Sequence, residues 1–188
     1  TMAITSALGA CVGLVSGFFR NRIDDVLMRI CDVMMSFPSE VMILAIVGMM
    51  GPGLENVVIA NVVAKWPWYA RMVRSIVRQY SDKDYIRFAK VAGGSSIRIM
   101  MRHLLPGTAG ELFVLTTLDT GSVILMISAL SFLGLGVQPP TPEWGMMLNE
   151  AKEVMTMYPL QMIPAGMAIL LVVAAFNFLC DSLRDAFD

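Results

Sequence analysis

Long apolar runs, separated by short polar connections, form the pattern of this chain from one end to the other. A helix needs about 20 mostly apolar residues to cross the hydrocarbon core of a bilayer. The runs that approach this length are residues 2–19, about 33–50, about 56–76, 120–142 and 160–180. Glu40 interrupts the second run, and Lys65 and several arginines interrupt the third. The pattern predicts an all-α, polytopic membrane protein with about five transmembrane helices.

The composition supports a membrane protein. The chain has 188 residues, of which 56% are hydrophobic and only 15% are charged, whereas soluble domains carry about 25% charged residues. The net charge of −1 favours neither a nucleic acid nor an acidic partner. We therefore expect a single transmembrane domain over residues 1–188, with lipid around it and no nucleic acid bound.

Basic residues fall almost entirely on one side of this topology, and that side is the cytoplasm by the positive-inside rule. Twelve of the fourteen share it: Arg20, Arg22, Arg29, Arg71, Arg74, Arg78, Lys83, Arg87, Lys90, Arg98, Arg102 and Arg184. The opposite side holds residues 51–55 and 137–159, with Lys152 as its base. The N-terminus is then outside and the C-terminus inside, in a multi-pass protein of the cytoplasmic membrane.

The first apolar run begins almost at Thr1, without an initiator Met or a basic flank. A signal peptide would have a basic region before its apolar run and a cleavage site of small residues after it. Neither is evident here. We therefore expect an N-terminally truncated fragment that has lost upstream sequence.

Some positions inside the runs predict helix contacts and functional charges. Gly9, Gly13 and Gly17 recur every four residues, so they predict one stripe on which another helix packs closely. Asp119 lies furthest into an apolar run and is either a pathway-lining group or an interhelical hydrogen-bond partner. Glu40 is a second pathway candidate, nearer an interface. A further charge, Asp32, follows Arg29 by three residues, which favours an intrahelical ion pair.

The segment of about residues 77–107 is a basic connection between apolar runs. The pair Gly93-Gly94 divides it into two short predicted helices, and Ser95 or Ser96 is placed to cap the second. Pro106 is expected to stop the segment before the next span. Small residues at the corner would let it enter a groove of a partner protein. A basic hairpin held by anionic lipid is an equal alternative on spacing alone.

A resemblance bears on this choice. Ala89-x-x-x-Gly93, nine further residues, and then His103-Leu-Leu105-Pro106 resemble the EAA loop of bacterial ABC importer permeases. The whole chain is similar to the second, C-type subunit of the dipeptide, oligopeptide and nickel permeases. The matching segments are DVMMSFP (32–38), WYARMVR (68–74), SFLGLGVQPPTPEWG (131–145) and AFNFLCDSLRD (175–185).

The resemblance implies a type I ABC importer permease, whose two-helix cytoplasmic loop enters a cleft of an ATPase subunit. The ATPase-coupling residues that it implies are Arg87, Phe88, Ala89, Gly93, Gly94, Ser95, Leu105 and Pro106. Arg87 and Phe88 stand where the family usually has Glu and Ala, and His103 stands where an aliphatic residue is usual. These departures put a Glu-mediated contact in doubt.

The same resemblance implies the partners. They are a second permease subunit in a heterodimer, two cytoplasmic ATPase subunits and an extracellular or periplasmic solute-binding protein, for which residues 137–159 are the candidate docking segment. The sequence contains no GxxxxGK[ST] motif, so ATP is expected on the partner subunits and this chain needs no cofactor. No catalytic residue and no metal site are expected, since His103 is the only histidine.

Other functions and the substrate stay open at this point. A stand-alone channel or ion-coupled carrier is the alternative, because Asp119 lies within a span. An intramembrane enzyme lacks any pairing of a nucleophile with a base. The segments TTLDTG (116–121) and WPWYARMVRS (66–75) resemble nickel or metal-chelate permeases slightly more than peptide permeases. The expected substrate is therefore nickel or a metal chelate, with short peptides next.

Overall fold

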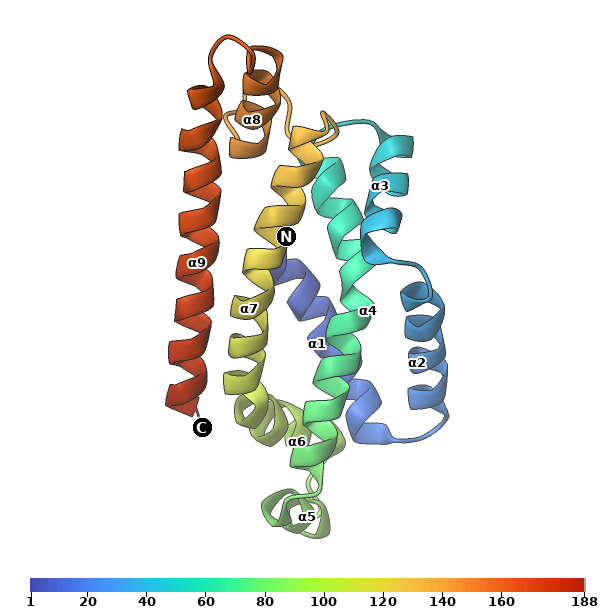
Figure 1. Ribbon diagram of the computed structural model, residues 1–188. Coiled ribbons are helices and arrows are strands. Elements are labelled where there is room, and N and C mark those ends of the chain that lie inside the picture. The colour runs from blue at the N-terminus through green and yellow to red at the C-terminus, as the bar shows by residue number, and fades with distance from the viewer. Residues whose placement is uncertain (188) are drawn as a thin grey trace.

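The computed structural model describes residues 1–187, and these form helices joined by short loops (Figure 1). The helices are α1 (Met2–Phe19), α2 (Arg22–Met35), α3 (Ser39–Met50), α4 (Leu54–Ser81), α5 (Asp84–Val91), α6 (Ser96–Ile99), the π-helix η1 (Met100–Leu104), α7 (Leu105–Phe132), α8 (Trp144–Glu153), the 3-10 helix η2 (Pro159–Gln161) and α9 (Met162–Phe187). The described chain contains no strand, so the all-α fold class is confirmed.

Three helical stretches are long and apolar enough to cross a membrane: Met2–Phe19, Ser96–Phe132 and Pro159–Ala186. The predicted span at 33–50 is not one helix. The helix is interrupted between Met35 and Ser39, and the axes of α2 and α3 meet at 76°. The interruption falls at Pro38, which has no N–H and disfavours a helical conformation in the residue before it. The bent pair α2–α3 adds a fourth span if it counts as one.

The remaining predicted span is part of α4. With 28 residues, α4 is about 42 Å long. Its charged side chains make it too polar to count among the three apolar candidate spans. It lies inside the bundle, where it packs against α1, α2, α3 and α7 (Figure 1). A charged helix is stable at membrane depth when its charges face protein partners, and the partners of α4 are described below.

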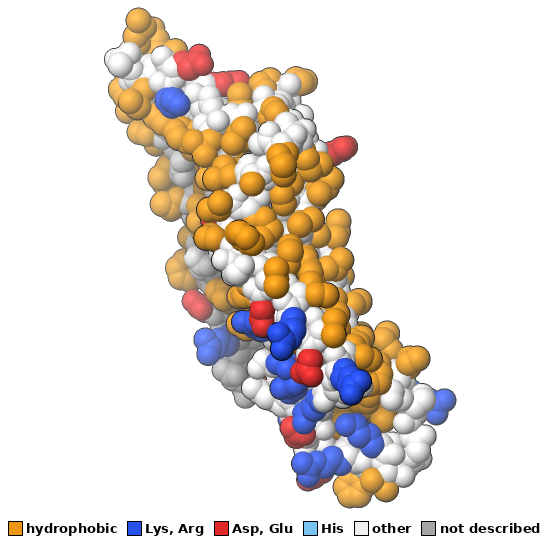
Figure 2. All heavy atoms as spheres, turned by 90° about the vertical axis from the view of Figure 1, so that its right-hand side faces the viewer, with side chains coloured by type: hydrophobic (Ala, Val, Ile, Leu, Met, Phe, Trp, Pro, Cys, Tyr) orange, Lys and Arg blue, Asp and Glu red, His pale blue; other side chains and the backbone are white. Residues whose placement is uncertain are grey.

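The helices run between two distinct ends (Figure 1). The lower end holds α5, α6 and the C-terminal part of α9, whereas the upper end holds α8 and the loop between α3 and α4. Figure 2 shows Lys and Arg side chains gathered over the lower part of one face, below a largely apolar flank. The structure thus places most of the basic residues together, as their grouping in the sequence predicts.

The predicted glycine contact is confirmed between α1 and α4. A Cβ atom at Gly13 would lie 2.6 Å from the carbonyl oxygen of Ala70. Gly9 faces Tyr69, and Gly17 faces Val77, in the same way. Only glycine lets the two backbones approach so closely, and this contact fixes α4 along its length.

Candidate functional site

The lower-end corner, residues 84–99, consists of α5, the turn at Gly93-Gly94 and α6. Gly93 has φ +77°, and its N–H donates to the carbonyl of Lys90, while the N–H of Gly94 donates to the carbonyl of Ala89 over 3.0 Å. This is the Schellman arrangement that ends helices at glycine. A Cβ at Gly94 would lie 2.8 Å from the Ala89 oxygen. The corner therefore needs both glycines, one for conformation and one for space.

The corner exposes apolar side chains while its base is buried. Phe88 is 74% exposed, Val91 86% and Ile97 71%. On the opposite side, Ile86 and Ile99 are buried in a core cluster with residues of α1, α4 and α7. A rigidly anchored corner with an apolar tip is typical of a protein docking site.

Two polar contacts hold the end of α4 and the corner beside it to the end of α1. The Arg20 side chain donates to the Asp82 carboxylate over 3.0 Å, and Lys90 lies 4.8 Å from the centre of the Phe18 ring. The hydrogen bond from Arg20 lowers the pKa of Asp82 below its ordinary value. A force on the corner would therefore reach α1 as well as α4.

The predicted coupling residues divide into two groups. Arg87, Phe88 and Ala89 lie on α5, and Ser95 precedes α6 without a side-chain capping bond. Leu105, at the start of α7, lies outside the corner and packs against the core cluster, as Ala89 also does. The other predicted residues of the corner are Gly93 and Gly94.

Pro106 does not stop the segment, contrary to the sequence prediction. The helical stretch continues from Ser96 to Phe132, with Pro106 in the first turn of α7. The π-helix η1 precedes it, and the Leu105 N–H donates to the carbonyl of Met100, five residues back. This wider turn accommodates a residue without an N–H. The corner is thus joined to α7 by continuous helix.

A charged seam joins α2 to α4 and was not predicted from the sequence. Asp24 is 2% exposed and accepts hydrogen bonds from Arg74 over 2.5 and 2.7 Å, as well as from Arg78 and Ser16. The sequence feature that could have indicated this seam is the spacing of the α4 arginines, which recur every three or four residues and share one helix face.

Asp32 also belongs to this seam. The predicted intrahelical pair with Arg29 is wrong, since Asp32 pairs with Arg71 of α4. Spacing of three residues permits an intrahelical pair, but here α4 presents a closer arginine. Together the two acidic residues of α2 hold this half of the broken span against α4.

Asp119 of α7 makes an interhelical ion pair. Its carboxylate accepts hydrogen bonds from Lys65 over 2.6 Å and from Tyr69 over 3.0 Å, both of α4, and it is 8% exposed. It also lines a cavity of about 410 Å³ at the kink before Pro38, together with Glu40. The structure thus brings the two predicted pathway residues to one cavity, but the charge of Asp119 is already compensated.

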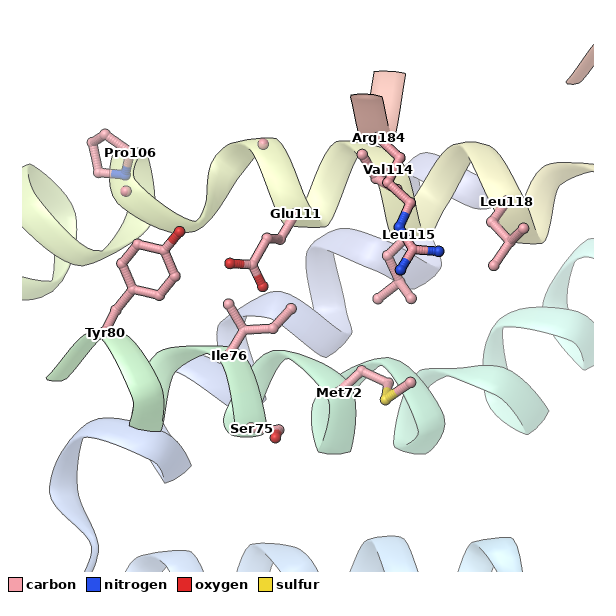
Figure 3. A pocket seen from close by; sticks show the side chains of 12 residues that line it. Met72, Ser75, Ile76, Tyr80, Pro106, Glu111, Val114, Leu115, Leu118 and Arg184 are labelled. Atoms are coloured by element: carbon pink, nitrogen blue, oxygen red, sulfur yellow. The ribbon is translucent and has the colours of Figure 1, made fainter. Parts of the chain in front are cut away.

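A larger cavity of about 640 Å³ lies nearer the lower end, between α4, α7 and α9 (Figure 3). The charged side chains that line it are Glu111 of α7 and Arg184 of α9, and Tyr80 of α4 lies beside Glu111. Neither Glu111 nor Arg184 was a predicted site residue. Within residues 1–187 no group of three or more His, Cys, Asp or Glu side chains is placed to hold a metal ion.

At the upper end, α8 is tied to the end of α7. Glu143 caps α8 by accepting from the Met146 N–H over 2.9 Å and also accepts from the Ser128 hydroxyl over 3.0 Å. Asn149 donates to the Phe132 carbonyl over 2.6 Å. Beyond these anchors, the side chains of Met157, Tyr158 and Leu160 are exposed. The segment 137–159 thus forms a fixed platform at this end.

Residues 9–188 match the model of a protein family described as the binding-protein-dependent transport system inner membrane component. The chain is 45% identical over 166 residues to the metal-staphylopine import system permease protein CntC of Staphylococcus aureus, covering 88% of this chain and 57% of that protein. It is 39% identical over 187 residues to the nickel transport system permease protein NikC of Escherichia coli, covering 100% of this chain and 68% of NikC.

A third relative is the glutathione transport system permease protein GsiD of Pectobacterium atrosepticum. The two are 42% identical over 181 residues, which cover 96% of this chain and 60% of GsiD. The chain therefore spans about three fifths to two thirds of the length of these relatives. All three relatives are permease proteins by name, and they differ in the solute that their systems move.

Proposed function

Because the chain belongs to the family of binding-protein-dependent transport system inner membrane components, we propose that it is the permease subunit of an ATP-driven importer and forms part of the translocation pathway. The observation that carries this proposal is the anchored corner with its exposed apolar tip. Such a tip at the basic end of a membrane bundle is suited to contact a cytoplasmic protein.

The coupling mechanism follows from how the corner is attached. Its base is packed against α1 and α4, and helix is continuous from Ser96 into α7. A displacement of the corner would therefore move α4 and α7 together. Because packed helices shift as units rather than deforming smoothly, this movement would open or close the cavities between them. The energy is expected from ATP hydrolysed on two separate cytoplasmic subunits.

The remaining partners are proposed on the same basis. A second permease subunit would complete the pathway, and an extracellular or periplasmic binding protein would deliver solute to the platform at 137–159. The relatives' systems move metal-staphylopine, nickel or glutathione. We therefore propose nickel, a metal chelate or a short peptide as the cargo. The alternative of a stand-alone channel or ion-coupled carrier was based on a free Asp119 within a span. The pairing of Asp119 with Lys65 removes that basis.

The corner is tested by Gly93→Asp in the full-length protein co-expressed with its ATPases. We expect the ATPases no longer to co-purify, because Asp adds backbone strain at φ +77° and a charge at the apolar tip. Gly51→Asp is the matched control: Gly51 also has a positive φ, +91°, and no neighbour within 4 Å, but it lies at the opposite end. Equal co-purification of both variants would contradict the docking role.

A further inference from the structure

Asn61 of α4 buries an amide group that has no partner in the protein. Its side chain is 0% exposed, and within residues 1–187 neither its amide nitrogen nor its carbonyl oxygen has a hydrogen-bond partner. The other buried side-chain atoms without a partner there are single atoms in the last turn of α4, Nε of Arg78 and Oγ of Ser81. A buried polar group that stays unpaired costs stability. Asn61 therefore destabilises the packing described here.

Asn61 belongs to a stripe of polar side chains on α4. Lys65 follows it by four residues and Tyr69 by eight, and positions four residues apart share a helix face. Lys65 and Tyr69 both donate to the Asp119 carboxylate of α7. Because α4 and α7 run in opposite directions, Asn61 lies one turn nearer the upper end than this ion pair (Figure 1). Asn61 is thus the next donor along the same stripe.

The Asp119 carboxylate is suited to a change of donors. A carboxylate has about four acceptor positions, and here Lys65 and Tyr69 donate to it. A shift of α4 toward the lower end relative to α7, by about one helical turn or about 5.4 Å, would replace Tyr69 by Asn61 as a donor. Lys65 would remain within reach. The buried charge would therefore be satisfied in both packings.

The contact between α4 and α7 leaves room for such a shift. Below the ion pair lies the cavity of about 640 Å³, with Met72 of α4 and Leu118 of α7 among its lining residues. Above the ion pair, α4 presents the small side chains of Ala60 and Ala64 to the apolar cluster that includes Leu130 of α7. The glycine contact and the charged seam hold α1 and α2 to α4, so these helices would move with it. One-turn displacements of packed elements are an established form of conformational switching.

We propose that Asn61 is a positioning residue for the transport cycle, because its amide donates to Asp119 in a second packing of α4 against α7, displaced by one helical turn. The unpaired amide destabilises the first packing and its hydrogen bond stabilises the second. A group with different interactions in two states shifts the equilibrium between them. The inference rests on the proposed permease function, in which movement of the corner supplies the displacement.

The first test compares two asparagines of α4 in the solubilised complex of the full-length permease with its ATPases, without nucleotide. Asn61→Leu should raise the thermal unfolding temperature of the permease by about 2–4 °C, because it removes a buried amide without a partner. Asn56→Leu is the matched control: the Asn56 amide donates to the carbonyls of Met50 and Gly51, so its loss should lower this temperature. A lower temperature in both Asn61→Leu and the smaller Asn61→Val would show that the Asn61 amide is satisfied in the first packing, and would overturn the proposal.

Cysteine cross-linking of the same complex in proteoliposomes follows the shift itself. Ser122 of α7 and Ala64 of α4 line one cavity, and Ala60 lies one turn further up α4. We expect ATP with vanadate to lower the cross-linking of S122C with A64C and to raise that of S122C with A60C. Asn61→Leu should reduce this exchange about tenfold, because a hydrogen bond to a charged group is lost. Asn56→Leu should leave the exchange unchanged.

The possible results separate the switch from the function on which it rests. An exchange in Asn61→Leu equal to that of the wild type would overturn the role of Asn61 and leave the permease function standing. The same conclusion would follow if a wild-type complex with bound ATPases showed no exchange. ATPases that do not co-purify with the wild-type permease would instead overturn the permease function, and the switch with it.

Discussion

The lower-end corner and the charged seam between α2 and α4 depart from the usual distribution of side chains in opposite ways: one exposes apolar groups, and the other buries a charge. The corner exposes Phe88 and Val91, which soluble and membrane proteins alike tend to cover. The seam buries Asp24, but Arg74, Arg78 and Ser16 satisfy its carboxylate. The corner thus leaves apolar side chains uncovered, whereas the Asp24 carboxylate of the seam is satisfied within this chain. Substitutions in the seam should affect folding, and substitutions at the corner should affect assembly.

Asp24→Ala should have the largest effect on stability. Removing the carboxylate leaves two arginines without their partner, and breaking a buried ion pair costs about 3–5 kcal/mol. We expect a large fall in the thermal unfolding temperature of the detergent-solubilised protein. The control is Asp25→Ala, the exposed neighbouring position, where a surface substitution changes stability by less than about 0.5 kcal/mol. Similar losses in both variants would show that the seam does not stabilise the fold.

Lys65→Met should have the next largest effect, because it leaves Asp119 charged and buried. We expect a loss of about 3 kcal/mol, and the double variant with Asp119→Leu should recover a large part of it, since a buried pair replaced by apolar residues is often neutral. Unfolding of the two single variants and the double variant measures the coupling. A double variant that loses the sum of both single effects would mean that the two residues act independently.

These two regions also show what a sequence can predict. The corner was predictable, because Gly93-Gly94 determines a helix end through local backbone geometry. The seam was not, because Asp24 and Arg74 are fifty residues apart and meet only once α2 is bent away from α3. For the same reason the sequence suggested Arg29 for Asp32, and left Asp119 open between two roles. Glu111 and Arg184 line one cavity from different helices, and no local sequence pattern relates them.

Phe88→Ala tests the other side of the comparison. The exposed ring should contribute to docking, not to folding, so we expect the unfolding temperature to stay unchanged while ATPase affinity falls by about 2 kcal/mol, the size of an interface hot spot. Titration of the solubilised permease with its ATPase measures this affinity. Leu160→Ala, an equally exposed apolar position near the upper end, should leave the affinity unchanged. Equal losses in the two variants would remove the special role of the corner.

The ion pair between Arg20 and Asp82 should show the smallest effect, because both side chains are solvent-exposed and exposed pairs contribute little. The hydrogen bond from Arg20 lowers the pKa of Asp82 in the folded protein. Its contribution is therefore fully present above the ordinary Asp pKa, about 4, and is lost as the pH falls through the lower, folded value. Asp82→Asn should remove this acid sensitivity and leave stability at neutral pH slightly reduced. Unfolding profiles of the wild type and the variant that converge below about pH 4 would confirm that the end of α4, next to the corner, is tied to α1 by charge. Parallel profiles would leave packing as its attachment.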